Sequence, residues 1–129
     1  RAIGCPNCFL SFAKERKQFG QPIARFQAIA FKLAEMATEI EAARNLLYKA
    51  CRLKDAGLPF TKHAAMAKLY CAEVMGRVVD QAVQIHGGYG LMKEYNIERF
   101  YRDYKLLTIG EGTSEIQKIV ISRQIGCYE

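Results

Sequence analysis

A single glutamate between two glycines, in the stretch IGEGTSEIQ (109–117), is the residue of this sequence best suited to acid–base chemistry. Gly110 and Gly112 leave space on both sides of Glu111, as a general base that approaches a substrate carbon requires. The backbone amides of this segment could also polarise a carbonyl oxygen of the same substrate. The pattern therefore favours proton abstraction beside a carbonyl group.

A structural role for the same carboxylate is the alternative. Negative side chains stabilise the N-terminal turn of a helix by interacting with its dipole. However, Ser114 and Gln117 have the spacing of a capping box, which predicts that the following helix is capped without help from Glu111. Because Glu111 lies too early in the chain to be needed as a cap, we favour the chemical interpretation.

A second candidate segment is QIHGGYG, from Gln84 to Gly90, which has three glycines within four residues. Bare backbone of this kind can approach a flat or bulky ligand and offer amide donors to it. A turn that merely ends a helix is the alternative. The segment does not match GxGxxG and no strand precedes it, so a Rossmann nucleotide site is not predicted.

A third candidate is the corner ERKQFGQPIARFQ, residues 15–27, where cationic and aromatic side chains alternate. A guanidinium can bind a phosphate and a ring can stack on a base, so the corner could hold a nucleotide. A helix–helix corner stabilised by a buried phenylalanine explains the same residues. The side chains concerned are Arg16, Lys17, Phe19, Arg25 and Phe26.

The elements that must position these segments are predicted to be helices. We expect helices at about 6–17, 23–55, 61–85, 96–107 and 114–124. Gly57 is expected to end the second helix in a left-handed conformation, and Thr61 to cap the third. Short glycine-bearing turns between helices predict an all-α fold, an up-and-down four-helix bundle with a short extra helix.

Two hydrophobic patterns place the long helices. Apolar residues on 23–55 recur every three or four positions, as in helices that pack at shallow angles; they are Phe26, Ile29, Leu33, Met36, Ile40, Ala43, Leu47 and Ala50. Apolar residues nearly encircle 61–85, which predicts that this helix lies inside the bundle.

Length and composition restrict the alternatives. With 129 residues, half of them apolar, the chain is expected to form a single domain. Its net charge of +6 would favour nucleic acid, an anionic membrane or a phosphate-bearing coenzyme, but the basic residues are dispersed. No apolar run is long enough to span a membrane, so membrane insertion is not predicted. Because the basic residues are dispersed and no recognition-helix pattern is present, nucleic-acid binding is not predicted either.

The five cysteines are Cys5, Cys8, Cys51, Cys71 and Cys127, and only CPNC (5–8) brings two of them close in sequence. No second pair and no suitably spaced histidine accompanies it, so no metal site is predicted. Reduced thiols indicate a reducing compartment, the bacterial cytoplasm or the mitochondrial matrix.

Four segments taken together, ERKQFGQPI, QIHGGYG, YNIERFYRD and EGTSEIQ, resemble the C-terminal α-helical domain of acyl-CoA dehydrogenases. They occur in the family's order and the resemblance covers essentially the whole chain. A glutamate in the EGT position is similar to short- and medium-chain members. Gly110 departs from the tyrosine often found there, which obscures the preferred acyl length.

The resemblance implies FAD-dependent α,β-desaturation of an acyl-CoA thioester. Glu111 would remove the α-proton and Gly112 would lie against the substrate. The residues implied to contact FAD are Thr113, Ser114 and Glu115 near the base, Arg16, Gln18, Phe19 and Gln27 at the basic corner, and Gln84, Ile85, His86, Gly87 and Gly88 against the FAD of a neighbouring subunit. Electron-transfer flavoprotein as electron acceptor and a homo-oligomer, a dimer or tetramer, are also implied.

Length is the main departure from the family. Its members also have an N-terminal helical domain and a middle β-domain, so residues 1–129 are interpreted as a fragment of a larger flavoprotein that is inactive on its own. The competing interpretation is a non-catalytic helical module for oligomerisation or interaction. That module would explain the packing pattern but not the placement of Glu111 between glycines.

Overall fold

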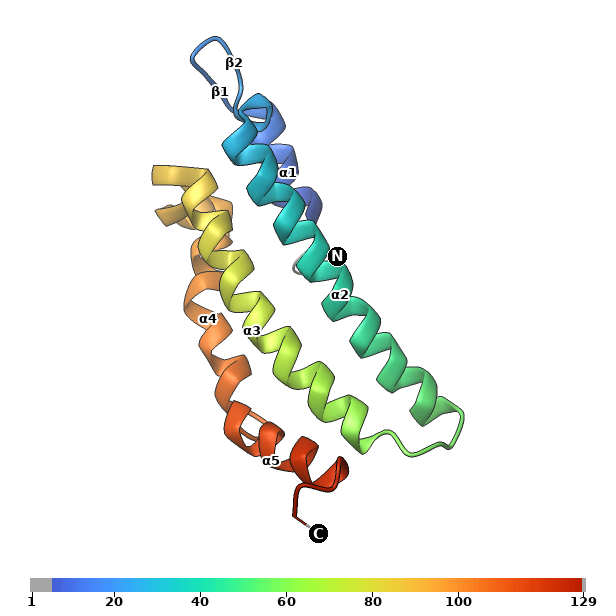
Figure 1. The fold of residues 1–129 in the computed structure, drawn as a ribbon. Coiled ribbons are helices and arrows are strands. Elements are labelled where there is room, and N and C mark those ends of the chain that lie inside the picture. Colours follow the sequence, from blue (N-terminus) through green and yellow to red (C-terminus); the bar gives the residue numbers. More distant parts are fainter. Residues whose placement is uncertain (1–5, 129) are drawn as a thin grey trace.

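The computed structural model describes residues 6–128, and Figure 1 shows their arrangement. The helices are α1 (Pro6–Glu15), α2 (Gln27–Asp55), α3 (Thr61–His86), α4 (Ile97–Ile109) and α5 (Ser114–Gln124). Short 3-10 turns are η1 (Ile23–Arg25), η2 (Gly87–Leu91) and η3 (Lys93–Tyr95), and two-residue strands are β1 (Lys17–Gln18) and β2 (Gln21–Pro22). Helices α1 to α4 run alternately up and down and α5 is short, which confirms the all-α prediction.

Helix α3 lies at the centre of the fold, between α2 on one side and α4 with α5 on the other (Figure 1). Its buried residues are Ala65, Ala67, Ala72, Val74, Val78, Val79, Ala82, Ile85 and His86. They occur on several faces, because helices pack against α3 from both sides. The prediction from its nearly encircling apolar residues is therefore confirmed.

The predicted apolar face of α2 is confirmed for most of its length. Leu33, Met36, Ala43 and Ala50 are buried, whereas Leu47 leaves 47% of its surface exposed. Ala50, the next member of the pattern, is buried again, so the exposure of Leu47 is local to that position.

The turn between α2 and α3 shows one confirmed prediction and one wrong one. Gly57 has φ +66°, and its N–H donates to the carbonyl of Lys54 while Leu58 N–H donates to Leu53, which is a Schellman motif. Thr61 does not cap α3. The cap position is Phe60, whose carbonyl already accepts from Ala64 N–H at 2.8 Å, so Thr61 is the first helical residue.

A tight hairpin replaces the predicted ends of two helices. α1 ends at Glu15 and α2 begins at Gln27, because β1 and β2 pair antiparallel between them. The two turn residues, Phe19 and Gly20, have φ +52° and +80°, as a type I′ turn requires. The sequence offered only one glycine there, so a strand pair was not predicted.

In the part of the chain that the structure describes, no group of three or more His, Cys, Asp and Glu side chains could hold a metal ion. Cys5 and the side chain of Cys8, which form the CPNC pair, lie outside the described residues. No helix in 6–128 combines the length and the apolar character needed to cross a membrane.

Candidate functional site

The glutamate loop, residues 110–113, connects α4 to α5 and has an unusual backbone. Glu111 has φ +56° and Gly112 has φ +92°, both in the left-handed region. Such a conformation is uncommon for a residue with a side chain and often marks a functional position. Glu111 is exposed, so its carboxylate can be reached by a ligand.

The predicted capping box at the start of α5 is wrong. Thr113 is the cap, and its hydroxyl accepts from Ile116 N–H at 3.4 Å, whereas Ser114 is the first helical residue. Gln117 instead donates from Nε2 to the carbonyls of Glu111, at 3.3 Å, and of Gly112, at 3.2 Å. The conclusion that Glu111 is not the cap still holds, because Thr113 has that role.

A largely apolar hollow of about 400 Å³ adjoins the glutamate loop. Its walls come from α3, α4 and the loop itself, and the residues are Lys68, Cys71, Ala72, Leu106, Leu107, Gly110 and Glu111. Lys68 donates from Nζ to the carbonyl of Gly112 at 2.5 Å. Burial raises the pKa of the Cys71 thiol, so that side chain stays neutral. The loop thus places one carboxylate at the edge of an apolar space.

The predicted basic corner lies at the other end of α3. Arg16 is half-buried, donates from Nη1 to the Tyr89 hydroxyl at 3.1 Å, and stands 4.8 Å from the centre of the same ring. Phe19 projects from the hairpin with 93% of its surface exposed. Gln18 and Gln27 are exposed beside it. The corner thus offers a guanidinium, an uncovered ring and two amides to a ligand.

The loop after α3 packs on the same corner through aromatic rings. His86 stacks on Phe12 with ring centres 4.0 Å apart, and Tyr89 and Tyr95 surround the pair. Burial lowers the pKa of His86, and the hydrogen bond from its Nδ1 to the carbonyl of Ala82, at 2.8 Å, opposes this only in part. The ring is therefore neutral and fixed in the core.

Side-chain exposure divides the residues of this loop into two sets. Ile85 and His86 are buried, whereas Gln84, Gly87 and Gly88 are exposed. A Cβ added to Gly87 or Gly88 would meet nothing within 4 Å, so the space beside this backbone is open. A ligand at this place would contact backbone and the Gln84 side chain, rather than the His86 ring.

The structure brings the predicted residues together in two groups, not one. Lys68 on α3 contacts the glutamate loop through the Gly112 carbonyl, and Gln84 lies sixteen residues further along the same helix. At about 1.5 Å per residue, Lys68 and Gln84 are roughly 24 Å apart along the helix axis. Figure 1 shows the hairpin and the end of α3 at one end of the molecule and α5 at the other. One copy of the chain therefore does not bring Arg16 to Glu111.

Glu115 belongs to the group at the glutamate loop. Its carboxylate is exposed, and hydrogen bonds from its own backbone N–H and from the Thr113 hydroxyl lower its pKa. Glu115 is consequently ionised and satisfied locally. Glu111 is the carboxylate that borders the apolar hollow.

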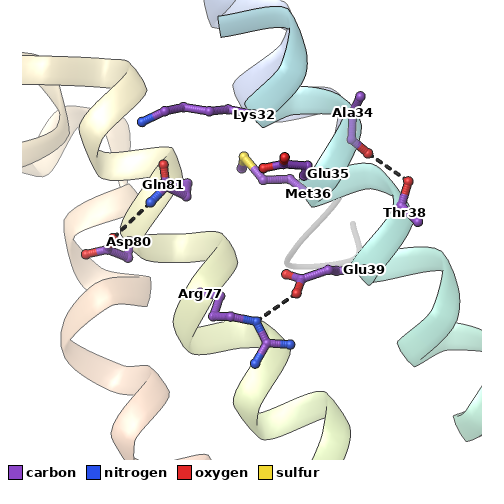
Figure 2. A pocket seen from close by; sticks show the side chains of 9 residues that line it. All are labelled: Lys32, Ala34, Glu35, Met36, Thr38, Glu39, Arg77, Asp80 and Gln81. Atoms are coloured by element: carbon purple, nitrogen blue, oxygen red, sulfur yellow. Dashed lines mark hydrogen bonds and ion pairs between the residues drawn. The ribbon is translucent and has the colours of Figure 1, made fainter. Parts of the chain in front are cut away.

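A larger hollow, of about 790 Å³, lies between α2 and α3 and contains none of the predicted site residues (Figure 2). Arg77 and Glu39 face each other across it in an ion pair of 2.7 Å. The other charged side chains along it are Lys32, Glu35 and Asp80. Size alone therefore does not identify the functional site of this chain.

Lys68 and Tyr89 were not assigned a role from the sequence, and Gln117 was assigned only the capping role that the structure does not show. Lys68 could not be singled out, because the same helix also carries Lys62, Glu73, Arg77 and Asp80. Tyr89 lies within QIHGGYG, but its pairing with Arg16 joins positions 73 residues apart. The Gln117 contacts depend on the positive φ of the loop, which no simple pattern predicts.

Comparison with known proteins agrees with these features. Residues 2–126 match the family model described as "Acyl-CoA dehydrogenase, C-terminal domain". The probable acyl-CoA dehydrogenase YngJ of Bacillus subtilis is 63% identical over 116 residues, covering 90% of this chain and 30% of that protein. The caffeyl-CoA reductase–Etf complex subunit CarC of Acetobacterium woodii is 56% identical over 113 residues, covering 88% and 30%.

A solved structure shows the same fold. The FAD complex of PigA superposes with a TM-score of 0.91 at 31% identity, covering 96% of this chain and 32% of PigA. This chain spans about a third of the length of each of these proteins. The match over nearly all its residues shows that the chain belongs to the acyl-CoA dehydrogenase family, as the C-terminal helical domain.

Proposed function

We propose that this chain is the C-terminal domain of a FAD-dependent acyl-CoA dehydrogenase in which Glu111 removes the α-proton of an acyl-CoA thioester. The observation that carries this proposal is the exposed Glu111 carboxylate, which lies at the edge of an apolar hollow on a backbone of positive φ. An apolar environment excludes water and makes a carboxylate more effective as a base. The names of the relatives, which act on CoA thioesters, support the substrate class.

The residues present fit a flavin dinucleotide. Arg16 supplies a guanidinium for a diphosphate, Phe19 supplies an exposed ring, and Gly87 and Gly88 leave open space beside the backbone. Gln18, Gln27 and Gln84 add polar contacts at this end, while Thr113, Ser114 and Glu115 would contact the coenzyme near the base. FAD, when bound, would supply the acceptor for the hydride that leaves the β-carbon.

A homo-oligomer, a dimer or tetramer, is the second part of the proposal. The two groups of residues are roughly 24 Å apart along α3, at opposite ends of one chain. Two copies could each give one group to the same coenzyme. In that arrangement Gln84–Gly88 of one protomer would lie against the coenzyme that serves Glu111 of its partner.

The remaining parts of the enzyme would come from a longer polypeptide. The relatives are about three times as long as this chain, which supports its interpretation as a fragment that is inactive alone. Leu106, Leu107 and Ile109 are exposed on α4 and would be covered by another domain. We place the enzyme in the bacterial cytoplasm or mitochondrial matrix, with electron-transfer flavoprotein as acceptor; the Etf complex of a relative supports that partner.

Replacement of the base tests the proposal. In the complete flavoprotein, Glu111→Gln keeps the size of the side chain but removes its basicity, and general-base catalysis contributes about a hundredfold to ten-thousandfold. We expect flavin reduction by a panel of acyl-CoA thioesters, followed anaerobically by absorbance, to slow by at least about a hundredfold. Glu73→Gln, an exposed carboxylate on α3, is the matched control. Wild-type reduction by Glu111→Gln would refute the assignment.

A further inference from the structure

We propose that Lys68 is a positioning residue for Glu111, because its ammonium group binds the carbonyl of the next residue, Gly112, and so fixes the glutamate loop. The inference rests on the proposed role of Glu111 as the base. It adds a residue that lies 44 positions before Gly112 in the chain. Lys68 acts through the backbone of the loop.

The environment of Lys68 directs its ammonium to the loop. The side chain is half-buried and lines two apolar hollows, the one of about 400 Å³ beside Glu111 and another of about 360 Å³ bordered by Leu47 and Phe60. Its Nζ lies 2.5 Å from the Gly112 oxygen. A charge-assisted hydrogen bond is stronger than a neutral one, and apolar surroundings strengthen it further. The contact therefore fixes two elements that are distant in sequence.

The glutamate loop needs such support because its backbone is not in a favoured conformation. Glu111 is held at φ +56°, and a side chain there persists only where the surroundings impose it. Gln117 contributes from α5, through two longer bonds from one amide. Lys68 contributes the short, charged bond from α3. The carbonyl that follows the base is thus tied to two different helices.

Loss of the ammonium should release the loop without removing the base. A neutral side chain of similar length leaves the apolar stem in place, so the effect should be confined to the loop. A displacement of about 1 Å in a catalytic group can cost a hundredfold in rate. Because the ammonium is engaged by the Gly112 carbonyl and the apolar stem is kept in the variants, substrate affinity should change little.

The experiment uses the complete flavoprotein with Lys68→Met, Lys68→Gln and Lys68→Arg, and Lys118→Met on the exposed face of α5 as the matched control. Hydrogen–deuterium exchange of peptides covering 109–117 is the first measurement. We expect both neutral variants to exchange about tenfold faster in this segment only, the size expected for one lost hydrogen bond. Lys68→Arg should restore slow exchange, and Lys118→Met should not alter it.

The second measurement separates positioning from binding. For the neutral variants we expect the rate constant of flavin reduction to fall between about tenfold and a hundredfold, with KM changed less than about threefold. Unchanged exchange in both neutral variants would overturn the proposal. Faster exchange with an unchanged reduction rate would overturn the positioning role.

The two proposals fail separately. If Glu111→Gln keeps wild-type flavin reduction, the base assignment falls whatever Lys68 does. If Glu111→Gln abolishes reduction while the neutral Lys68 variants keep both slow exchange and the wild-type rate, only the Lys68 proposal falls. A loop that loosens in the Lys68 variants, together with a loss of rate that Lys68→Arg restores, supports both.

Discussion

Replacing Gly112 with alanine tests the geometry of the glutamate loop directly. A Cβ at Gly112 would lie 2.9 Å from Nε2 of Gln117 and 3.5 Å from Cγ2 of Ile116. The close atom is the end of a flexible side chain, so it can move away. When it moves, however, Gln117 loses its hydrogen bonds to the carbonyls of Glu111 and Gly112.

The expected cost has two parts. Placing alanine at φ +92° destabilises the folded chain by about 1–2 kcal/mol. Alanine also reduces the conformational entropy of the unfolded chain, which offsets about 0.4–1 kcal/mol of this loss. The lost Gln117 bonds, which are long and partly exposed, add about 1–2 kcal/mol. Gly57→Ala also places alanine at a positive φ, +66°, but its Cβ would meet nothing within 4 Å. Gly112→Ala should therefore be more destabilising than Gly57→Ala by about 1–2 kcal/mol.

Equilibrium urea unfolding of the 129-residue chain, followed by circular dichroism, gives the three free energies of unfolding that are needed. Equal slopes against urea concentration are the check that the variants unfold from comparable states. Gly88→Ala is a second control, because it has neither a positive φ nor a nearby atom and should be neutral or slightly stabilising. If Gly112→Ala and Gly57→Ala cost the same, the argument from Gln117 is refuted.

Three further predictions concern stability and use the same unfolding assay. Thr113→Ala should lower the free energy of unfolding by about 1 kcal/mol because it removes the cap of α5, whereas Ser114→Ala should change that free energy little. A larger loss in Ser114→Ala would instead support Ser114 as the cap. Met36→Ala should cost about 2–5 kcal/mol because the side chain is 2% exposed, and a loss below 1 kcal/mol would mean that the core collapses around the cavity. Burial lowers the pKa of His86, so the unfolded chain binds a proton at a higher pH than the folded chain does. The free energy of unfolding should therefore decrease as the pH falls below about 6.5. This decrease should be shallower in His86→Gln, and an equally steep decrease in that variant would contradict the assignment.

The sequence predicts the helices well because their signals are local. Apolar spacing identified α2 and α3, and Gly57 identified the turn between them through a conformation that only glycine adopts easily. The hairpin at residues 17–22 could not be predicted, since one of its two left-handed residues is Phe19. The start of α3 at residue 61 was predicted, but its cap was misassigned, because Thr61 has the right residue type for a cap and only the backbone shows that Phe60 occupies that position.

The candidate site was predictable in its parts but not in its arrangement. Glu111 was found from its flanking glycines, and Arg16 from its aromatic neighbours. Neither the distance between the two groups nor the contact from Lys68 to Gly112 follows from local spacing, because both depend on how α3 places residues far apart in the sequence. Tertiary contacts of this kind are set by packing between helices, which a single pattern of apolar residues does not specify.

The central position of α3 also has a consequence for the order in which the chain folds. Helices α2 and α3 are joined by a short turn and pack along each other, so their contacts close the smallest loops and should form early. Helix α5 packs mainly on α3, and so it can dock only on a surface that already exists. The segment that carries Glu111 should therefore be ordered last during folding and be among the first to open in the native protein.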